Sequence, residues 1–158
     1  MAGTDQRIAK ITLDERSVVR RNADVEHERA VAIFDLLEEN SFALVAGPPG
    51  PFHLHLGIEE NRIVLDIRST DDAPIERVLL PVTSFRSIIK DYFLVCESYF
   101  NAIRTQSPSR IEAIDMGRRA LHNEGSEVLR ERLAERVAID LNTARRLFTL
   151  VCVLHIRA

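Results

Sequence analysis

Two neighbouring segments of the chain alternate between apolar and polar residues, and their spacing constrains how they pair. Every second residue is apolar in residues 52–58, and residues 62–69 alternate in the same way. This period of two predicts β-strands with one buried face. If Glu60-Asn61 is a two-residue turn, both apolar sets reach the same face of a hairpin. The predicted pairs are Ile58 with Ile63, Leu56 with Leu65, and Leu54 with Ile67.

Further strands and one helix are predicted in the first half of the chain. Residues 7–13, 41–46 and 75–82 are short, strand-like apolar segments. Residues 24–40 carry apolar side chains on one helical stripe, with acidic residues near its start, where the helix dipole favours negative charge. The Gly-Pro-Pro-Gly-Pro run at 47–51 continues neither a helix nor a strand ladder. Together these segments predict an antiparallel β-meander of four to five strands with one face in water.

The second half of the chain is predicted to be helical throughout. Thr83 or Ser84 can cap a helix that runs to about residue 105 and is apolar around most of its circumference. Ser109, with Glu112 three residues later, is a capping box that predicts the start of the next helix.

Residues 125–156 are predicted to end one helix and to form two more. Gly125 can take a positive φ and is predicted to close the helix that begins near Ser109. A short helix over residues 126–137 and a last helix over residues 142–156 follow. Because residues 147–154 are apolar on every side, the last helix must be buried. The meander is thus expected to pack against about five helices.

These elements predict a single α+β domain over residues 1–158. The sequence has no internal repeat and no long linker, and 46% of its residues are apolar, which suffices for one core. Its formal charge of −3 is unevenly divided, with a net −6 in residues 1–82 and a net +3 in residues 83–158. We expect much of this opposite charge to pair within the chain or across a dimer. Two nearly all-apolar helices beside one small sheet also predict a homodimer.

The cysteines and the apolar segments bear on location. Cys96 and Cys152 lie in apolar, helix-like segments without CxxC spacing, which predicts buried thiols in a reducing compartment. Residues 1–10 contain no apolar stretch, so no secretory signal is expected there. The longest strongly apolar run has about eight residues, whereas a membrane span needs roughly 20. The sequence therefore predicts a cytoplasmic protein without a membrane partner.

Two histidines on the predicted hairpin are candidate metal ligands. His53 and His55 leave the same face of their strand, and the register places His55 opposite Asp66 and His53 opposite Arg68. Two imidazoles and a carboxylate could hold zinc or non-haem iron with open coordination positions. The favoured alternative is a half-exposed cross-strand pair that stabilises the sheet by about 0.2–1 kcal/mol. No HExxH or CxxC motif supports the metal site.

A second candidate cluster lies in the helical half. His122 with Asp115, Arg118 and Arg119 could hold an anion and move a proton. The spacing of Asp115 and Arg119 is equally typical of a surface ion pair, and a histidine near a helix C-terminus also complements the helix dipole.

Arg145 and Arg146 are predicted to occupy helix positions where positive charge is unfavourable. They are predicted to lie in the first turn of the last helix, where the dipole disfavours positive charge. Asp140, a carboxylate from the acidic first half, or a bound phosphate could offset them. An internal ion pair is the favoured interpretation.

Several kinds of site are missing from the sequence. It contains no GxxxxGK[ST], GxGxxG, GxSxG or kinase signature, and no cofactor is predicted. Acidic residues interleave with arginines over residues 127–136, so no helix has an uninterrupted basic face and nucleic-acid binding is not expected. The class of any small-molecule ligand stays unknown.

With these residues described, the chain resembles a family of small uncharacterised bacterial proteins of about this length. The matching segments are EHERAVAIFDLLEENSF at 26–42, KDYF at 90–93, CESYF at 96–100, IEAIDMGRRALHNEGSEVLRERL at 111–133 and TARRLFTLVCVLH at 143–155. The resemblance implies a bacterial cytoplasmic protein. It brings no activity, cofactor or catalytic residue.

Two functional hypotheses follow. The favoured one is a non-catalytic binding module, acting as a homodimer through the polar sheet face or the region from Arg118 to His122. The alternative is a small metal-dependent or acid–base enzyme. Its candidate residues are His53, His55 and Asp66, or Asp115, Arg119 and His122.

Overall fold

The computed structural model describes residues 5–14 and 23–155 of the chain. The predicted helix end at Ile156, and residues 1–4 of the segment searched for a secretory signal, lie outside the described residues. The helices are α1 (Ala23–Glu38), α2 (Arg86–Thr105), α3 (Pro108–Leu133) and α4 (Leu141–His155). The strands are β1 (Ile8–Leu13), β2 (Phe42–Leu44), β3 (Phe52–Glu59), β4 (Arg62–Arg68), β5 (Pro74–Pro81) and β6 (Val137–Ile139). The fold is α+β, as predicted.

The predicted hairpin is present with the predicted register. β3 and β4 pair antiparallel, and β5 pairs antiparallel with β4 on its other side. Glu60 and Asn61 form the turn with positive φ angles of 51° and 63°, as a two-residue type I′ turn requires. The paired positions are Ile58 with Ile63, Leu56 with Leu65, and Leu54 with Ile67.

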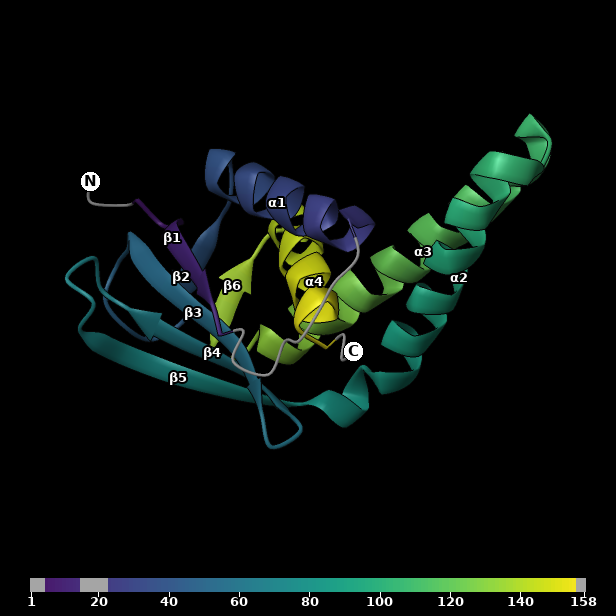
Figure 1. The fold of residues 1–158 in the computed structure, drawn as a ribbon. Helices are drawn as coiled ribbons and strands as arrows, with labels where there is room; N and C mark the ends of the chain where they lie inside the picture. The colour runs from purple at the N-terminus through teal and green to yellow at the C-terminus, as the bar shows by residue number, and fades with distance from the viewer. Residues whose placement is uncertain (1–4, 15–22, 156–158) are drawn as a thin grey trace.

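The antiparallel meander has fewer strands than predicted, because β1 runs parallel to its neighbour β3. The strand order of the main sheet is β1-β3-β4-β5, and β1 pairs parallel with β3. α1 and β2 separate these two strands in the chain (Figure 1), and a connection of this length permits parallel pairing. The sheet is therefore mixed, with the meander restricted to β3, β4 and β5.

The C-terminal half is not entirely helical. β6 pairs antiparallel with β2 in a second, two-stranded sheet. Val137 and Ile139 are buried on one face of β6, where Val137 was predicted to end a short helix. The two paired strands are far apart in sequence, so a local pattern could not indicate that they would meet.

The helix count and the helix starts also differ from the prediction. The described residues form four α-helices instead of about five, because α3 continues through Gly125. α2 begins after Phe85, and Thr83 and Ser84 lie in a preceding 3₁₀ turn. α3 is capped by Ser107, whose hydroxyl accepts a hydrogen bond from the Arg110 amide at 3.4 Å. Ser109, the predicted cap, lies inside the helix.

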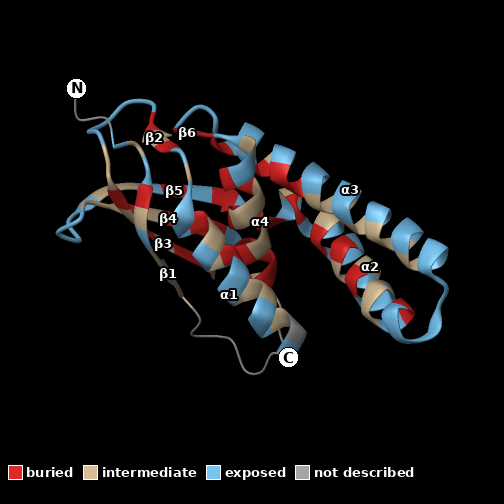
Figure 2. Cartoon of the chain, turned by 90° about the horizontal axis from the view of Figure 1, so that it is seen from above, coloured by how far each residue is buried: buried red, intermediate tan, exposed pale blue. Residues whose placement is uncertain are grey.

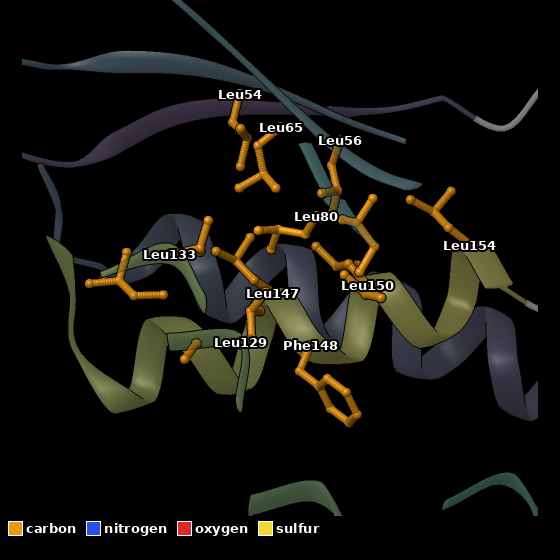
Figure 3. Close-up of a cluster of buried hydrophobic side chains, with 14 of the residues drawn as sticks. Leu54, Leu56, Leu65, Leu80, Leu129, Leu133, Leu147, Phe148, Leu150 and Leu154 are labelled. Atoms are coloured by element: carbon orange, nitrogen blue, oxygen red, sulfur yellow. The ribbon is translucent and has the colours of Figure 1, made fainter. Parts of the chain in front are cut away.

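α4 lies at the centre of the molecule and is buried by the chain itself. The main sheet lies on one side of α4, while α1 and α3 pack against it elsewhere (Figures 1 and 2). Figure 3 shows side chains of the sheet and of the helices meeting in this core. They are Leu54, Leu56, Leu65 and Leu80 from the sheet, and Leu129, Leu133, Leu147, Phe148, Leu150 and Leu154 from the helices. The predicted burial of the last helix is confirmed, and no second copy of the chain is required for it.

α2 and α3 form a long helical hairpin that extends away from the sheet (Figure 1). Leu94 and Ile103 of α2 and Met116 of α3 are each more than half exposed on it. Cys96 and Cys152 are buried free thiols, as predicted, and burial raises the pKa of both. No helix in the described part of the chain is long and apolar enough to cross a membrane.

Gly125 allows α3 and α4 to approach each other closely. It is buried in the middle of α3, and a Cβ atom at this position would overlap three carbons of the Phe148 ring on α4. The glycine is therefore required for its missing side chain and not for the end of a helix. The close approach fixes where Phe148 and its neighbours on α4 lie against α3.

We expect Gly125→Ala to lower the free energy of unfolding by about 1–3 kcal/mol, because the added methyl group overpacks the contact with Phe148. For a chain of this length, that lowers Tm by roughly 2–12 °C. Gly117→Ala is the matched control on an exposed position of α3, where the added Cβ would meet only Val95 at 3.9 Å. It should raise stability by up to about 1 kcal/mol. Thermal melting followed by circular dichroism measures both, and a stabilised Gly125→Ala variant would contradict the contact.

Candidate functional site

Parts of all four helices line one cavity of about 330 Å³, which we call the four-helix cleft. Figure 1 shows α1 and α4 beside the part of the α2–α3 hairpin that is nearest the sheet, and residues of these four helices line the cavity. Its polar residues are His27, Glu28 and Asp35 from α1, Arg118, Arg119 and His122 from α3, and Arg145, Arg146 and Thr149 from α4. Val31, Ala32 and Tyr92 form its less polar wall. The cleft joins the predicted His122 cluster to the two arginines of the last helix.

His122 is held in the cleft as a neutral imidazole. The Thr149 hydroxyl donates its proton to the Arg145 carbonyl at 3.1 Å, so His122 Nε2 donates to Thr149 Oγ1 at 2.7 Å. The imidazole also packs against the rings of both Tyr92 and Phe148, with centroid distances of 5.4 and 5.3 Å. Burial, followed by the charges of Arg145, Arg118 and Arg146, lowers the pKa of His122 to about 4.

Arg118 and Arg119 share one carboxylate. Arg118 donates to Asp115 Oδ1 from Nε at 3.0 Å and from Nη2 at 2.5 Å, and Arg119 Nε lies 3.2 Å from Asp115 Oδ2. The Arg118 guanidinium also lies over the Tyr99 ring, 4.8 Å from its centroid, in a cation–π contact. The predicted pairing of Asp115 with Arg119 is thus present, but the carboxylate is bound by two arginines.

Arg145 and Arg146 lie in the second turn of α4, one turn later than predicted. α4 begins at Leu141, and Asp140 caps it by accepting a hydrogen bond from the Thr143 amide at 2.8 Å. Arg146 has a distant acidic neighbour on α1, with its Nη2 3.9 Å from Asp35 Oδ2. Asp140 therefore serves the helix end, and the carboxylate nearest Arg146 comes from the acidic first half.

Arg145 differs from the other arginines of the cleft. Its Nε is buried and has no hydrogen-bond partner among the described residues. A buried guanidinium nitrogen without an acceptor is uncommon, because leaving a buried donor unpaired costs about 1–3 kcal/mol. The favoured prediction of an internal ion pair is therefore not met at this nitrogen.

On the polar face of the sheet, the other candidate residues make contacts that differ from the predicted ones. His55 lies opposite Asp66 and His53 opposite Arg68, so the predicted register is confirmed. Asp66 Oδ2, however, accepts from Arg68 Nη2 at 2.7 Å. The carboxylate near both imidazoles is Asp72, which lies 3.1 Å from His55 Nε2 and 3.8 Å from His53 Nδ1.

This second set of contacts forms an ion-pair network beside the β4–β5 turn. Arg68 Nη1 donates to Asp72 Oδ2 at 3.0 Å, and hydrogen bonding from His55, with the charge of Arg68, lowers the pKa of Asp72. In the described ranges, no three His, Cys, Asp or Glu side chains are grouped so that they could hold a metal ion. The polar groups of the sheet face are thus bound to one another.

The sequence pattern did not single out the acidic residues of α1, or the tyrosine of α2, that line the four-helix cleft. Glu28, Asp35 and Tyr92 lie in ordinary helical patterns, and their convergence depends on how the helices pack. Thr149 lies in the apolar part of α4, where one polar residue between Phe148 and Leu150 was the only local signal.

We expect the stability of the chain to fall as the pH drops from about 6.5 towards 4, in part because of His122. Its folded pKa lies below its ordinary value of 6.5, so the unfolded chain binds the proton first as the pH falls. His122→Gln keeps a donor near Thr149 but cannot titrate. The loss of unfolding free energy between pH 7 and pH 4.5 should be smaller in this variant, by on the order of 2–3 kcal/mol. Urea denaturation at both pH values measures the loss, and equal losses in the two proteins would contradict the assignment.

Comparison with known proteins shows extensive similarity along the chain. A model of an uncharacterised protein family, UPF0262, matches residues 5–157. The UPF0262 protein amb3341 of Paramagnetospirillum magneticum is 59% identical over 152 residues, which cover 96% of this chain and 97% of that protein. A UPF0262 protein of Rhodospirillum rubrum is 61% identical over 147 residues, covering 93% of this chain and 91% of the relative. No solved structure matches.

Proposed function

The chain belongs to the uncharacterised protein family UPF0262, and we propose that it is a non-catalytic binding module whose four-helix cleft holds an anionic ligand. The observation that carries this proposal is the buried Nε of Arg145, which has no acceptor within the described residues. An anion in the cleft would supply that acceptor. Arginine suits this task because its planar guanidinium binds carboxylate or phosphate oxygens through paired hydrogen bonds.

The electrostatics of the cleft support an anionic ligand. Arg118, Arg145 and Arg146 all act on His122, and together with burial they keep its imidazole neutral near pH 7. Burial is the larger cause of this low pKa and disfavours any charge, but the three arginine charges also lower it, and their positive potential favours an added negative charge. The cavity volume of about 330 Å³ lies at the small end of the range of ligand pockets.

Two features favour binding over acid–base catalysis in this cleft. Asp115 accepts hydrogen bonds from Arg118 and lies against Arg119, so both of its oxygens are already occupied by guanidinium groups of the chain. His122 contacts Thr149 and two aromatic rings, and its low pKa makes it a weak base at neutral pH. On the sheet face, the pairing of Asp66 with Arg68 likewise supports a structural role.

The binding of small anions tests this proposal. Thermal melting with phosphate, sulfate, acetate and citrate, each against chloride at the same ionic strength, should show saturable stabilisation by at least one anion. At a hundredfold excess over Kd the gain is about 2.7 kcal/mol, which raises Tm by roughly 5–10 °C for this chain length. Arg145→Gln should abolish the gain, whereas Arg132→Gln, an exposed position of α3 outside the cleft, should preserve it. Equal melting temperatures in every anion would contradict an anion site.

We also propose that the module is a homodimer. α4 is covered within the chain, so support comes instead from the apolar residues left exposed on α1 and on the helical hairpin. Phe34 of α1 is 65% exposed, and Leu94 of α2 is 56% exposed. On α1, Ile33, Phe34 and Leu37 line one surface depression together, and a contiguous exposed apolar patch is typical of an interface. Light scattering at micromolar concentration should give twice the chain mass of 17.9 kDa, and a value of one chain mass would contradict the dimer.

We place this module in the cytoplasm, without a nucleic-acid partner or a cofactor. The two buried free thiols support a reducing compartment. The acidic residues between the arginines at the end of α3 oppose a phosphate backbone.

A further inference from the structure

The four-helix cleft contains more donors than a single carboxylate can use. Guanidinium groups reach it from two helices, with Arg118 and Arg119 on α3 and Arg145 and Arg146 on α4. A carboxylate offers two oxygens in one plane, whereas a phosphoryl group offers three oxygens that point in different directions. Donors that converge from different helices are better matched by the second shape.

The net charge of the cleft also favours a phosphoryl group. Four arginines stand against three carboxylates, Glu28 and Asp35 in the lining and Asp115 behind it. The excess is one positive charge while the histidines are neutral, and protonation of His122 raises it to two. A bound dianion would favour that proton on His122, because a nearby opposite charge stabilises the charged imidazole.

The opposite wall of the cleft is suited to an organic group. Val31 and Ala32 of α1 and the ring of Tyr92 on α2 line the same cavity as the arginines. The volume of about 330 Å³ restricts this group to a small one, because drug-sized ligands occupy pockets of roughly 300–1,000 Å³. A ligand with one charged end and one compact apolar end would contact both walls.

We propose that the ligand of the four-helix cleft is a small phosphomonoester, bound through its phosphoryl group by Arg145, with Arg146 and Arg118 beside it, and through its organic group by the wall at Val31 and Tyr92. This inference rests on the proposed function, because it names the ligand class of the same cleft. The guanidinium of Arg145, which lines the cleft and whose buried Nε has no acceptor among the described residues, would then bind a phosphoryl oxygen.

Isothermal titration of the full chain at pH 7.5 and constant ionic strength, with phenyl phosphate, inorganic phosphate and benzoate, tests the proposal. Phenyl phosphate should bind about tenfold more tightly than inorganic phosphate, which lacks the organic group, and at least tenfold more tightly than benzoate, which lacks the phosphoryl group. Arg145→Gln should weaken phenyl phosphate binding by at least about tenfold. Arg132→Gln, with the same change in net charge, should leave it within about twofold.

The possible outcomes separate the two proposals. Benzoate binding as tightly as phenyl phosphate would overturn the phosphomonoester and leave the anion-binding module standing. Equal binding of inorganic phosphate and phenyl phosphate would overturn the role of the organic group and assign the site to free phosphate. No binding of any of the three would overturn both proposals. If Arg145→Gln does not fold by circular dichroism, Arg146→Gln replaces it with the same expected direction, and unchanged binding in that variant would overturn the assigned contacts.

Discussion

The structure depends on the burial of α4, whose residues 147–154 are apolar around almost the whole helix. Such a helix must be covered all round, and the chain does this with the main sheet, α1 and α3. Gly125 permits the closest of these contacts, because a side chain there would overlap Phe148. Three polar residues of α4, Arg145, Arg146 and Thr149, lie in the region where α1, α3 and part of α2 meet. The four-helix cleft is thus a result of how the core is closed.

The elements that could be predicted from the sequence are those whose signal is local. Strand alternation and a two-residue turn determined the β3–β4 register, because a shift by one residue would have exposed the apolar face. The parallel entry of β1 and the pairing of β2 with β6 depend on contacts between distant segments. Gly125 was misinterpreted because a glycine that ends a helix and one that admits a neighbouring ring look identical in a single sequence.

The candidate site was predicted in two separate pieces for the same reason. Helical spacing grouped Asp115, Arg118, Arg119 and His122, and the unfavourable position of Arg145 and Arg146 drew attention to α4. Only the packing of α3 against α4 brings these groups into one cleft. The sheet histidines illustrate the opposite case, since their register was correct but the neighbouring carboxylate, Asp72, comes from a turn that the alternation did not cover.

We have proposed that the Arg145 guanidinium, whose buried Nε has no partner among the described residues, binds a tetrahedral oxyanion. Crystals of the protein soaked in selenate, a tetrahedral dianion with an anomalous signal, test it directly. We expect an anomalous peak inside the four-helix cleft, within hydrogen-bond distance of the Arg145 guanidinium. Selenate bound elsewhere on the molecule, with the cleft empty and Arg145 paired to a carboxylate of the chain, would contradict it.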